Sequence, residues 1–297
     1  MACMTTYFNL MHSLDFYFRQ GYSVDSIGKS LDGRDIPYIY VGKKGAPCIF
    51  ITAGIHAREH ISCYVVMQQL QYILSCSKYA SSTGDIGIYF LPMLNPDGNM
   101  LIAKGLGAMR NVDKTLLKKI IKKTPRALFK ANARGVDLNV NFDANWGTGK
   151  QNVFEPSFAN FVGAKPFSEP ESRALADFTY FKKPLATVSY HSLGREIYWE
   201  FGQTGQFKKR DKKIAEFLNQ RLKYNILDDD GTSAGGYKDW CIQKLAIPSF
   251  TIELGLDEFK HPFTDYSRAR DDVERNVDLP LKLAFAIHNS QFTMHNY

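Results

Sequence analysis

Short apolar runs alternate with segments of helical periodicity along this chain of 297 residues, and this alternation constrains the fold most. Five runs are apolar enough to be strands, several of them buried on both faces: 36–42, 48–54, 86–92, 185–190 and 248–254. Helical patterns fit residues 59–77, 169–182, 207–224 and 271–290. We therefore expect an α/β fold with a largely parallel sheet between helices. No repeat or linker divides the chain, so residues 1–297 are expected to form a single domain.

The composition is that of a globular protein, with 44% hydrophobic and 23% charged residues. No apolar stretch approaches the roughly 20 residues needed to cross a bilayer, so no membrane span is expected. The five cysteines are odd in number and mostly lie in apolar runs. This pattern favours buried free thiols, and a cytoplasmic rather than a secreted location.

Much of the net charge of +7 lies in residues 114–134, where Lys118, Lys119, Lys122 and Lys123 alternate with apolar pairs at helical spacing. We interpret this segment as an amphipathic surface helix, with an electropositive rim for an anionic substrate as the alternative. No interleaved aromatic residues or nucleic-acid-binding motif accompany the charges, so nucleic acid is not an expected partner. Oligomeric state cannot be read from the sequence.

Polar groups follow several of the predicted strands directly. His56 and Glu59 follow the run 48–54, the turn Asn95–Gly98 (NPDG) follows 86–92, and His191 and Glu253 end two further runs. Ligands of open parallel sheets bind beyond the carboxyl ends of the strands. We therefore expect these groups to converge at one edge of the sheet. Ser168 and Glu171, at the start of the helix predicted over 169–182, have the spacing of a capping box.

The stretch HAREH, residues 56–60, can be interpreted as a metal site in two ways. His56 and His60 could be ligands four apart on a helix with Glu59 as the base, which is the inverted zincin pattern. Alternatively, His56 and Glu59 are the ligands. Only Gly54 and Ile55 separate the strand from His56, which leaves no room for a helical turn before it. The second interpretation is therefore preferred, and His60 is not expected to be a ligand.

A third ligand is available at another strand end. His191 would complete a His₂Glu set with an open fourth position, the ligand type of catalytic zinc sites. Zinc lowers the pKa of a water ligand and polarises a carbonyl. A carboxylate must then move a proton from the water to the leaving amine, and Glu253 is the candidate.

At this point the residues resemble the zinc carboxypeptidase (M14) family. The resemblance lies in an ordered set of motifs that spans about residues 45–255: GIHAREH, NPDG, GVDLNVNF, SYHS, GGYKDW and FTIELG. It implies a single α/β/α sandwich around a mixed, largely parallel, twisted sheet with one catalytic Zn²⁺. His56, Glu59 and His191 match the zinc ligands of the family, and Glu253 matches its general base and acid.

The resemblance also implies roles for residues of the segment 126–141. Asp137 matches a carboxylate that orients a ligand histidine, and Asn139 matches a contact to the substrate carboxylate. Arg134 is the choice for the cation beside the oxyanion, with Arg126 and Arg110 as alternatives.

Three departures from the family pattern concern the substrate. Members that trim C-terminal residues carry N-R-N, whose arginine binds the terminal carboxylate, whereas this chain has Val140 in that place. The tyrosine that closes over substrate in digestive members is replaced by Gly231 or Thr232. Aligning GGYKDW with the family places Lys238 at the floor of the pocket for the side chain after the scissile bond, which predicts an acidic group there.

These features, the TSAGGYKDW stretch and the short chain without a pro-segment resemble the bacterial branch of the family that acts on murein. The resemblance implies hydrolysis of the γ-D-glutamyl to meso-diaminopimelate amide bond in peptidoglycan-derived peptides. One alternative is a metallocarboxypeptidase that removes C-terminal acidic residues. Another is an inactive peptidoglycan-binding module, against which the complete set of ligands and base argues.

Overall fold

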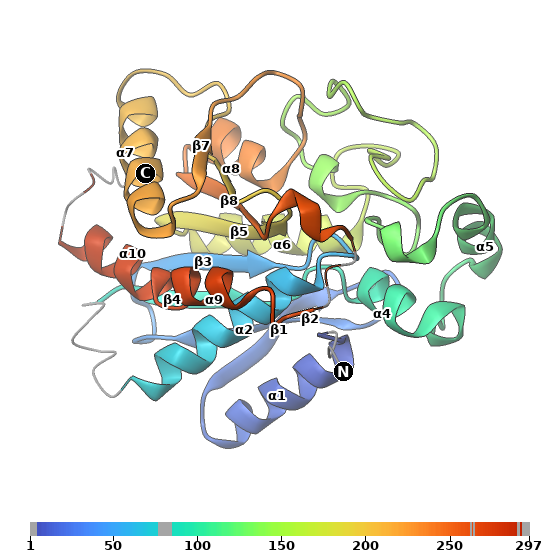
Figure 1. The fold of residues 1–297 in the computed structure, drawn as a ribbon, viewed down its shortest axis with the longest axis horizontal. Coiled ribbons are helices and arrows are strands. Elements are labelled where there is room, and N and C mark those ends of the chain that lie inside the picture. Colours follow the sequence, from blue (N-terminus) through green and yellow to red (C-terminus); the bar gives the residue numbers. More distant parts are fainter. Residues whose placement is uncertain (1–4, 77–84, 262, 264, 290–291, 293–297) are drawn as a thin grey trace.

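The computed structural model describes residues 5–76, 85–261, 263, 265–289 and 292, and its centre is one eight-stranded sheet (Figure 1). The spatial order of the strands is β1-β2-β4-β3-β5-β8-β6-β7. Their bounds are β1 Ser23–Lys29, β2 Asp35–Val41, β3 Cys48–Ala53, β4 Gly87–Leu91, β5 Ala186–Ser192, β6 Glu196–Tyr198, β7 Asn225–Leu227 and β8 Ser249–Leu254. The fold class expected from the sequence is confirmed.

The four strands at the middle of the sheet, β4, β3, β5 and β8, are parallel to one another. They correspond to four of the five predicted runs, and β2 corresponds to the fifth. The flanking pairs β1·β2, β2·β4 and β6·β8 are antiparallel, which makes the sheet mixed. Every residue of β3, β4 and β5 is buried, as expected for strands covered on both faces.

Helices cover both faces of the sheet (Figure 1). Ile49 and Ile51 of β3 pack in the larger core with α1, α2, α7 and α10, whereas Phe50 packs in the smaller core with α6 and α8. The α-helices are α1 Tyr7–Arg19, α2 His60–Ser75, α4 Pro96–Lys104, α5 Lys114–Lys123, α6 Pro170–Lys182, α7 Gly205–Leu222, α8 Tyr237–Leu245, α9 Arg270–Asn276 and α10 Leu279–His288.

Two local predictions are wrong. The helical pattern over 271–290 forms two helices, α9 and α10, and Pro280 stands in the first turn of the second; residue 290 lies outside the described part. Ser168 and Glu171 do not form a capping box, because Glu169 is the N-cap of α6. Glu171 is instead buried and accepts a hydrogen bond from the Leu31 N–H at 3.0 Å.

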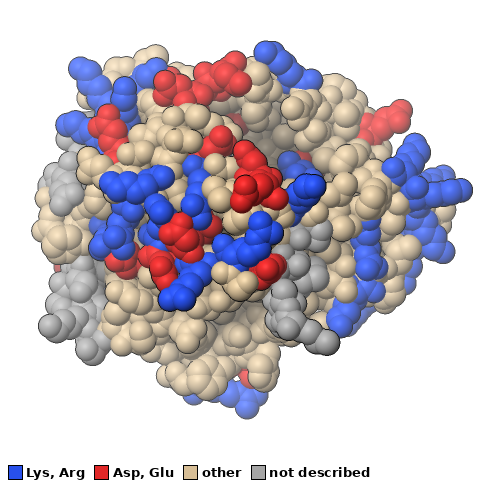
Figure 2. All heavy atoms as spheres, in the orientation of Figure 1, with Lys and Arg blue, Asp and Glu red and all other residues tan. Residues whose placement is uncertain are grey.

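The basic segment 114–134 forms a helix only as far as Lys123, after which Thr124 is extended and Pro125 follows. Leu117 and Ile120 of α5 are buried, while the four lysines are exposed. Lysines and arginines gather over this edge of the molecule (Figure 2). The amphipathic surface helix is therefore confirmed over α5.

Three of the cysteines, Cys48, Cys63 and Cys241, are buried free thiols, and Cys76 is a half-buried one. Cys3 lies outside the described residues. Among the described helices, none has the length and apolar character that a membrane crossing requires.

Candidate metal centre and active site

The parallel pairing of β3, β5 and β8 brings three sequence motifs to one edge of the sheet. Ala53 is opposite Tyr190, and His191 is opposite Glu253 in the register. His56 and Glu59 lie in the turn between β3 and α2, and α2 begins only at His60. His56 therefore precedes the helix, which excludes a site built from His56 and His60 on one helical face.

A close approach of the backbone shapes the turn that carries His56. Gly54 has a φ of +65°, and a Cβ atom there would lie 2.6 Å from the Cys63 sulfur. Only glycine fits this position without displacing the start of α2. The Asn95 side chain then donates hydrogen bonds to the carbonyls of Ile55, at 3.2 Å, and Ala131, at 3.0 Å. Asn95 thus ties the segment before His56 to the segment that carries Lys130.

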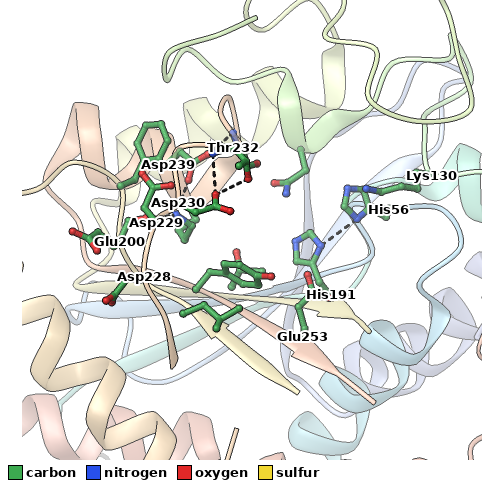
Figure 3. Close-up of a pocket in the computed structure, with 18 residues that line it drawn as sticks. His56, Lys130, His191, Glu200, Asp228, Asp229, Asp230, Thr232, Asp239 and Glu253 are labelled. Carbon is green, nitrogen blue, oxygen red and sulfur yellow. Dashed lines mark hydrogen bonds and ion pairs between the residues drawn. The ribbon is translucent and has the colours of Figure 1, made fainter. Parts of the chain in front are cut away.

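His56, Glu59 and His191 are buried and offer ligand atoms that all lie within 4.8 Å of one another. His56 Nδ1 is 2.8 Å from Glu59 Oε1, and His191 Nδ1 is 3.3 Å from Glu59 Oε2. The two histidine Nδ1 atoms are 3.2 Å apart and face one another (Figure 3). Two imidazoles and a carboxylate that converge in this way form a donor set suited to zinc.

The surroundings of the three side chains also fit a metal ion. Apart from its contact with His191, the buried Glu59 Oε2 has no hydrogen bond among the described residues. His56 Nε2 lies 3.2 Å from Asp137 Oδ1, so this ring can direct Nδ1 toward a metal while its other N–H is held by a carboxylate. His60 Nδ1 instead lies 2.9 Å from Asn99 Nδ2, outside the group.

Asp137 occupies the supporting position predicted for it. It is buried, and its second oxygen accepts a hydrogen bond from the Asn160 N–H at 3.1 Å and lies 3.6 Å from Lys130 Nζ. Burial opposes ionisation of Asp137, but the charge of Lys130 and the contact with His56 outweigh it and hold the pKa of the carboxyl below its usual range. Asp137 is therefore a carboxylate that can orient His56.

Glu253 lies beside this group without joining it. Its Oε2 atom is buried and has no hydrogen-bond partner within the described part of the chain. Burial, the largest influence, raises the pKa of Glu253 to about 8; His191 opposes this shift, and the charge of Glu59 reinforces it. A carboxyl with a pKa near neutrality can both accept and release a proton.

A cavity of about 490 Å³ opens from His56, His191 and Glu253. We call it the acidic pocket, because the side chains at its far end are mainly carboxylates (Figure 3): Glu200, Asp228, Asp229, Asp230 and Asp239. Asn139, predicted to contact substrate, also lines it. Thr232 lines the pocket near the place where the family's tyrosine is missing.

Lys238 lines the acidic pocket as predicted, but its ammonium group already has partners. It lies 2.6 Å from Asp239 Oδ1 and donates a hydrogen bond to the Glu200 carbonyl at 2.9 Å. An ammonium group has three protons, so one remains for a substrate. The surroundings of Lys238 are thus more acidic than the sequence indicated.

A second cavity, of about 370 Å³, is lined in part by the same residues as the acidic pocket. We call it the cationic pocket, because its lining includes Arg58, Lys130 and Lys260. His56, Lys130 and Glu253 line both pockets. No motif in the sequence indicates this second cavity.

The structure does not bring Arg134 into the site. Its half-exposed side chain donates to Glu169 Oε1 at 3.2 Å, and neither pocket includes it, Arg126 or Arg110. Lys130 lines both pockets instead, and sequence reasoning missed it because only arginines were considered. Lys130 is four residues before Arg134 in a loop, where spacing does not reveal which side chain points inward.

Two other predicted residues lie away from the pockets. Val140 is half-buried and lines neither of them. The NPDG turn follows β4 as expected, but Asp97 accepts hydrogen bonds from Ser30 Oγ at 2.8 Å and from Arg34 at 2.7 Å, in a separate buried cluster. The predicted convergence therefore holds for His56, Glu59, His191 and Glu253 but not for Asp97.

Comparison with known proteins agrees with this geometry. The model of the family described as "Zinc carboxypeptidase" matches residues 9–273, which is most of the chain. The chain belongs to the zinc carboxypeptidase family. The prediction of a zinc metallopeptidase fold and family is thereby confirmed, and the His-Glu-His group is one that could hold the metal of a zinc-dependent family.

Two bacterial relatives of this member of the family are 30% identical to it. One is the gamma-D-glutamyl-L-diamino acid endopeptidase 1 of Lysinibacillus sphaericus, matched over 81% of this chain and 62% of the relative. The other is the uncharacterized protein YqgT of Bacillus subtilis, matched over 82% of this chain and 68% of the relative. The chain thus spans about three fifths of the length of the first relative.

Solved structures of the family share the fold. The carboxypeptidase A of Helicoverpa armigera superposes with a TM-score of 0.74 at 21% identity, over 96% of this chain and 75% of that one. The murein-tripeptide amidase MpaA of Escherichia coli O157 superposes with a TM-score of 0.55 at 21% identity, over 89% and 92%.

Proposed function

We propose that this protein hydrolyses the amide bond between a γ-D-glutamyl residue and meso-diaminopimelate in peptidoglycan-derived peptides, with one zinc ion at His56, Glu59 and His191. The relative from Lysinibacillus sphaericus, whose name states a γ-D-glutamyl-L-diamino acid specificity, supports this proposal. So does the absence of a cation at Val140, where members that bind a free main-chain terminus carry arginine.

The observation that carries the proposal is the mixture of charges in the acidic pocket. The side chain of meso-diaminopimelate ends in both an ammonium and a carboxylate group. Lys238 has one N–H left for the carboxylate, and the exposed Asp229 and Asp230 lie at the same end of the pocket for the ammonium (Figure 3). A purely anionic side chain would meet more repulsion than attraction there.

The catalytic roles follow from the positions of the side chains. Zinc, when bound, supplies a Lewis acid that lowers the pKa of water and polarises the scissile carbonyl. Glu253 takes the proton of the attacking water and returns it to the leaving amine of diaminopimelate. Asp137 holds His56 in the orientation that leaves Nδ1 free for the metal.

Lys130 stabilises the negative charge that develops on the carbonyl oxygen. This role replaces the one expected for Arg134, because Lys130 lines both pockets beside Glu253. A positive charge in a partly buried site is worth more to the transition state than the same charge in water. The side chain of Lys130 is 20% exposed, so it is largely shielded from solvent.

A substrate comparison tests the proposal. The protein with zinc is incubated with L-Ala-γ-D-Glu-meso-diaminopimelate and, separately, with a peptide ending in glutamate, and products are identified by mass spectrometry. We expect release of diaminopimelate from the first and no release of glutamate from the second. Release of glutamate with the murein peptide intact would show the acidic-residue carboxypeptidase instead. Absence of both products and of bound zinc would indicate a binding module.

A further inference from the structure

We propose that the cationic pocket binds the free α-carboxylate of the γ-linked glutamyl residue, on the acyl side of the scissile bond. This inference rests on the proposed function. It gives a binding place to the acyl half of the substrate, which the acidic pocket does not bind. The two pockets share His56, Lys130 and Glu253, so a bond held at Glu253 has one half in each pocket. The amine half is placed in the acidic pocket by Lys238 and its acidic neighbours.

The acyl half then faces Arg58 and Lys260, two cations that, unlike Lys238, have no ion pair among the residues that the structure describes. The guanidinium of Arg58 donates one long hydrogen bond, to the Leu128 carbonyl at 3.4 Å, and its buried Nε finds no acceptor in the described part of the chain. A partly buried guanidinium without an anionic partner is suited to binding a carboxylate.

The nearby carboxylates do not satisfy these cations. Glu59 faces His56 and His191, and neither Glu59 nor Glu253 forms an ion pair with Arg58 or Lys260 among the described residues. Asp257, the remaining carboxylate of the lining, is exposed. Burial, the largest influence, lowers the pKa of His261 to about 4; Glu59 opposes this shift and Arg58 reinforces it, so the imidazole is neutral and does not compete for an anion. Arg58 and Lys260 therefore remain available to an anionic group of the substrate.

The chemistry of a γ-linked glutamyl residue matches this pocket. Its scissile carbonyl belongs to the side chain, so the main-chain carboxylate stays free, four bonds away on the acyl side. An α-linked peptide has an uncharged amide backbone in the same region. A cationic pocket at this place would therefore distinguish the two linkages by charge.

The test compares two substrates of nearly equal size. One is L-Ala-γ-D-Glu-meso-diaminopimelate, and the other is the same tripeptide with the α-carboxylate of glutamate converted to a carboxamide. kcat/KM is measured for each with the zinc-loaded protein. Because a charge-assisted hydrogen bond is replaced by a neutral one, we expect amidation to lower kcat/KM by about tenfold or more.

Variants then locate the effect. In Arg58→Gln/Lys260→Gln, the ratio of the two kcat/KM values should fall close to one, because the free carboxylate loses its partners. Lys260→Gln alone changes an exposed residue and is expected to fold. It should lower the ratio in part, so the test remains valid if the double variant does not fold. Lys118→Gln on α5 makes the same change of charge far from the site and should leave the ratio unchanged.

The outcomes separate the two proposals. If the wild-type protein hydrolyses neither tripeptide, the proposed function fails, and this inference fails with it. If the wild-type protein hydrolyses both tripeptides at equal rates, the proposed function stands, but the cationic pocket does not bind the free carboxylate. A third outcome is that the double variant hydrolyses both tripeptides and keeps the full preference for the free carboxylate. In that case another group binds the carboxylate, and the assignment to Arg58 and Lys260 is overturned.

Discussion

The acidic and the cationic pocket meet at the same catalytic groups but are built differently. In the acidic pocket the cation Lys238 is already paired with Asp239, whereas Asp229 and Asp230 have no ion pair among the described residues. In the cationic pocket Arg58 and Lys260 lack ion pairs among the described residues. Under the two proposals, the charges of the pockets determine which half of the substrate lies where, while the groups that the pockets share act on the bond between the halves.

Glu253 belongs to both pockets, so its loss should abolish hydrolysis whatever the substrate. For Glu253→Gln we expect kcat to fall by about a thousandfold or more, because the amide can neither take nor return the proton. Zinc content, measured by atomic absorption, should remain that of the wild type. Full hydrolysis by a zinc-loaded Glu253→Gln protein would refute the assignment of the proton transfer.

Asp137 lies behind the shared groups and lines neither pocket. Asp137→Asn should lower zinc affinity by about 10- to 100-fold, because His56 loses the carboxylate that orients it. Titration with a competing chelator measures the affinity, and kcat at saturating zinc should suffer less. An unchanged affinity would mean that the contact with His56 does not support a metal ligand.

Lys238 belongs to the acidic pocket alone. Lys238→Met should lower kcat/KM for L-Ala-γ-D-Glu-meso-diaminopimelate by about tenfold, through the loss of one charge-assisted hydrogen bond. L-Ala-γ-D-Glu-L-Lys, whose side chain has no carboxylate, is the control and should lose little. Equal losses for both tripeptides would show that Lys238 supports the pocket through Asp239 without contacting substrate.

Glu171 lies outside both pockets and should have the smallest effect on catalysis, but it should shape the pH dependence of stability. Burial, helped by the charge of Asp97, raises the pKa of Glu171 to about 7. The unfolded chain releases this proton near pH 4.5, whereas the folded chain keeps it until about pH 7. Stability should therefore fall by about 3 kcal/mol as the pH rises from 4.5 through 7.

Urea unfolding of Glu171→Gln at several pH values between 4.5 and 8 isolates this contribution. The free energy of unfolding of the variant should not show the decrease of about 3 kcal/mol between pH 4.5 and 7. Glutamine stays neutral over this range and still accepts a hydrogen bond from the Leu31 N–H. Its kcat/KM at neutral pH should match that of the wild type. Parallel pH profiles of stability for variant and wild type would contradict the assignment.

Much of the sheet and of the metal group could be predicted from local sequence. Runs such as 48–54 and 248–254 are apolar enough to be central strands, and the polar residues at their ends are then neighbours because the strands are parallel. The start of α2 at His60, which follows from the distance between strand and motif, decided between the two interpretations of HAREH.

Loop side chains were predicted less well. Arg134 and Lys130 lie in one irregular segment, where no periodicity relates spacing to direction. Glu169 draws Arg134 away, while Asp137 holds Lys130 near the site. Asp97 similarly pairs with Arg34, a residue 63 positions away. Its side chain therefore does not join the candidate site, although it follows the end of β4. The partners of Arg134 and Asp97 are distant in sequence, and the partner of Lys130 lies in the same irregular segment, so no local periodicity reveals any of them.

The sequence by itself determined the order of the strands along the chain, the ligand types at their ends and the family, because these depend on short motifs and apolar periodicity. The tertiary structure alone decided which cations lie beside Glu253, how acidic the surroundings of Lys238 are, and that a second, cationic pocket adjoins Glu253. The physical reason is that the electrostatics of a pocket sum over side chains from separate elements, and only folding brings those charges together.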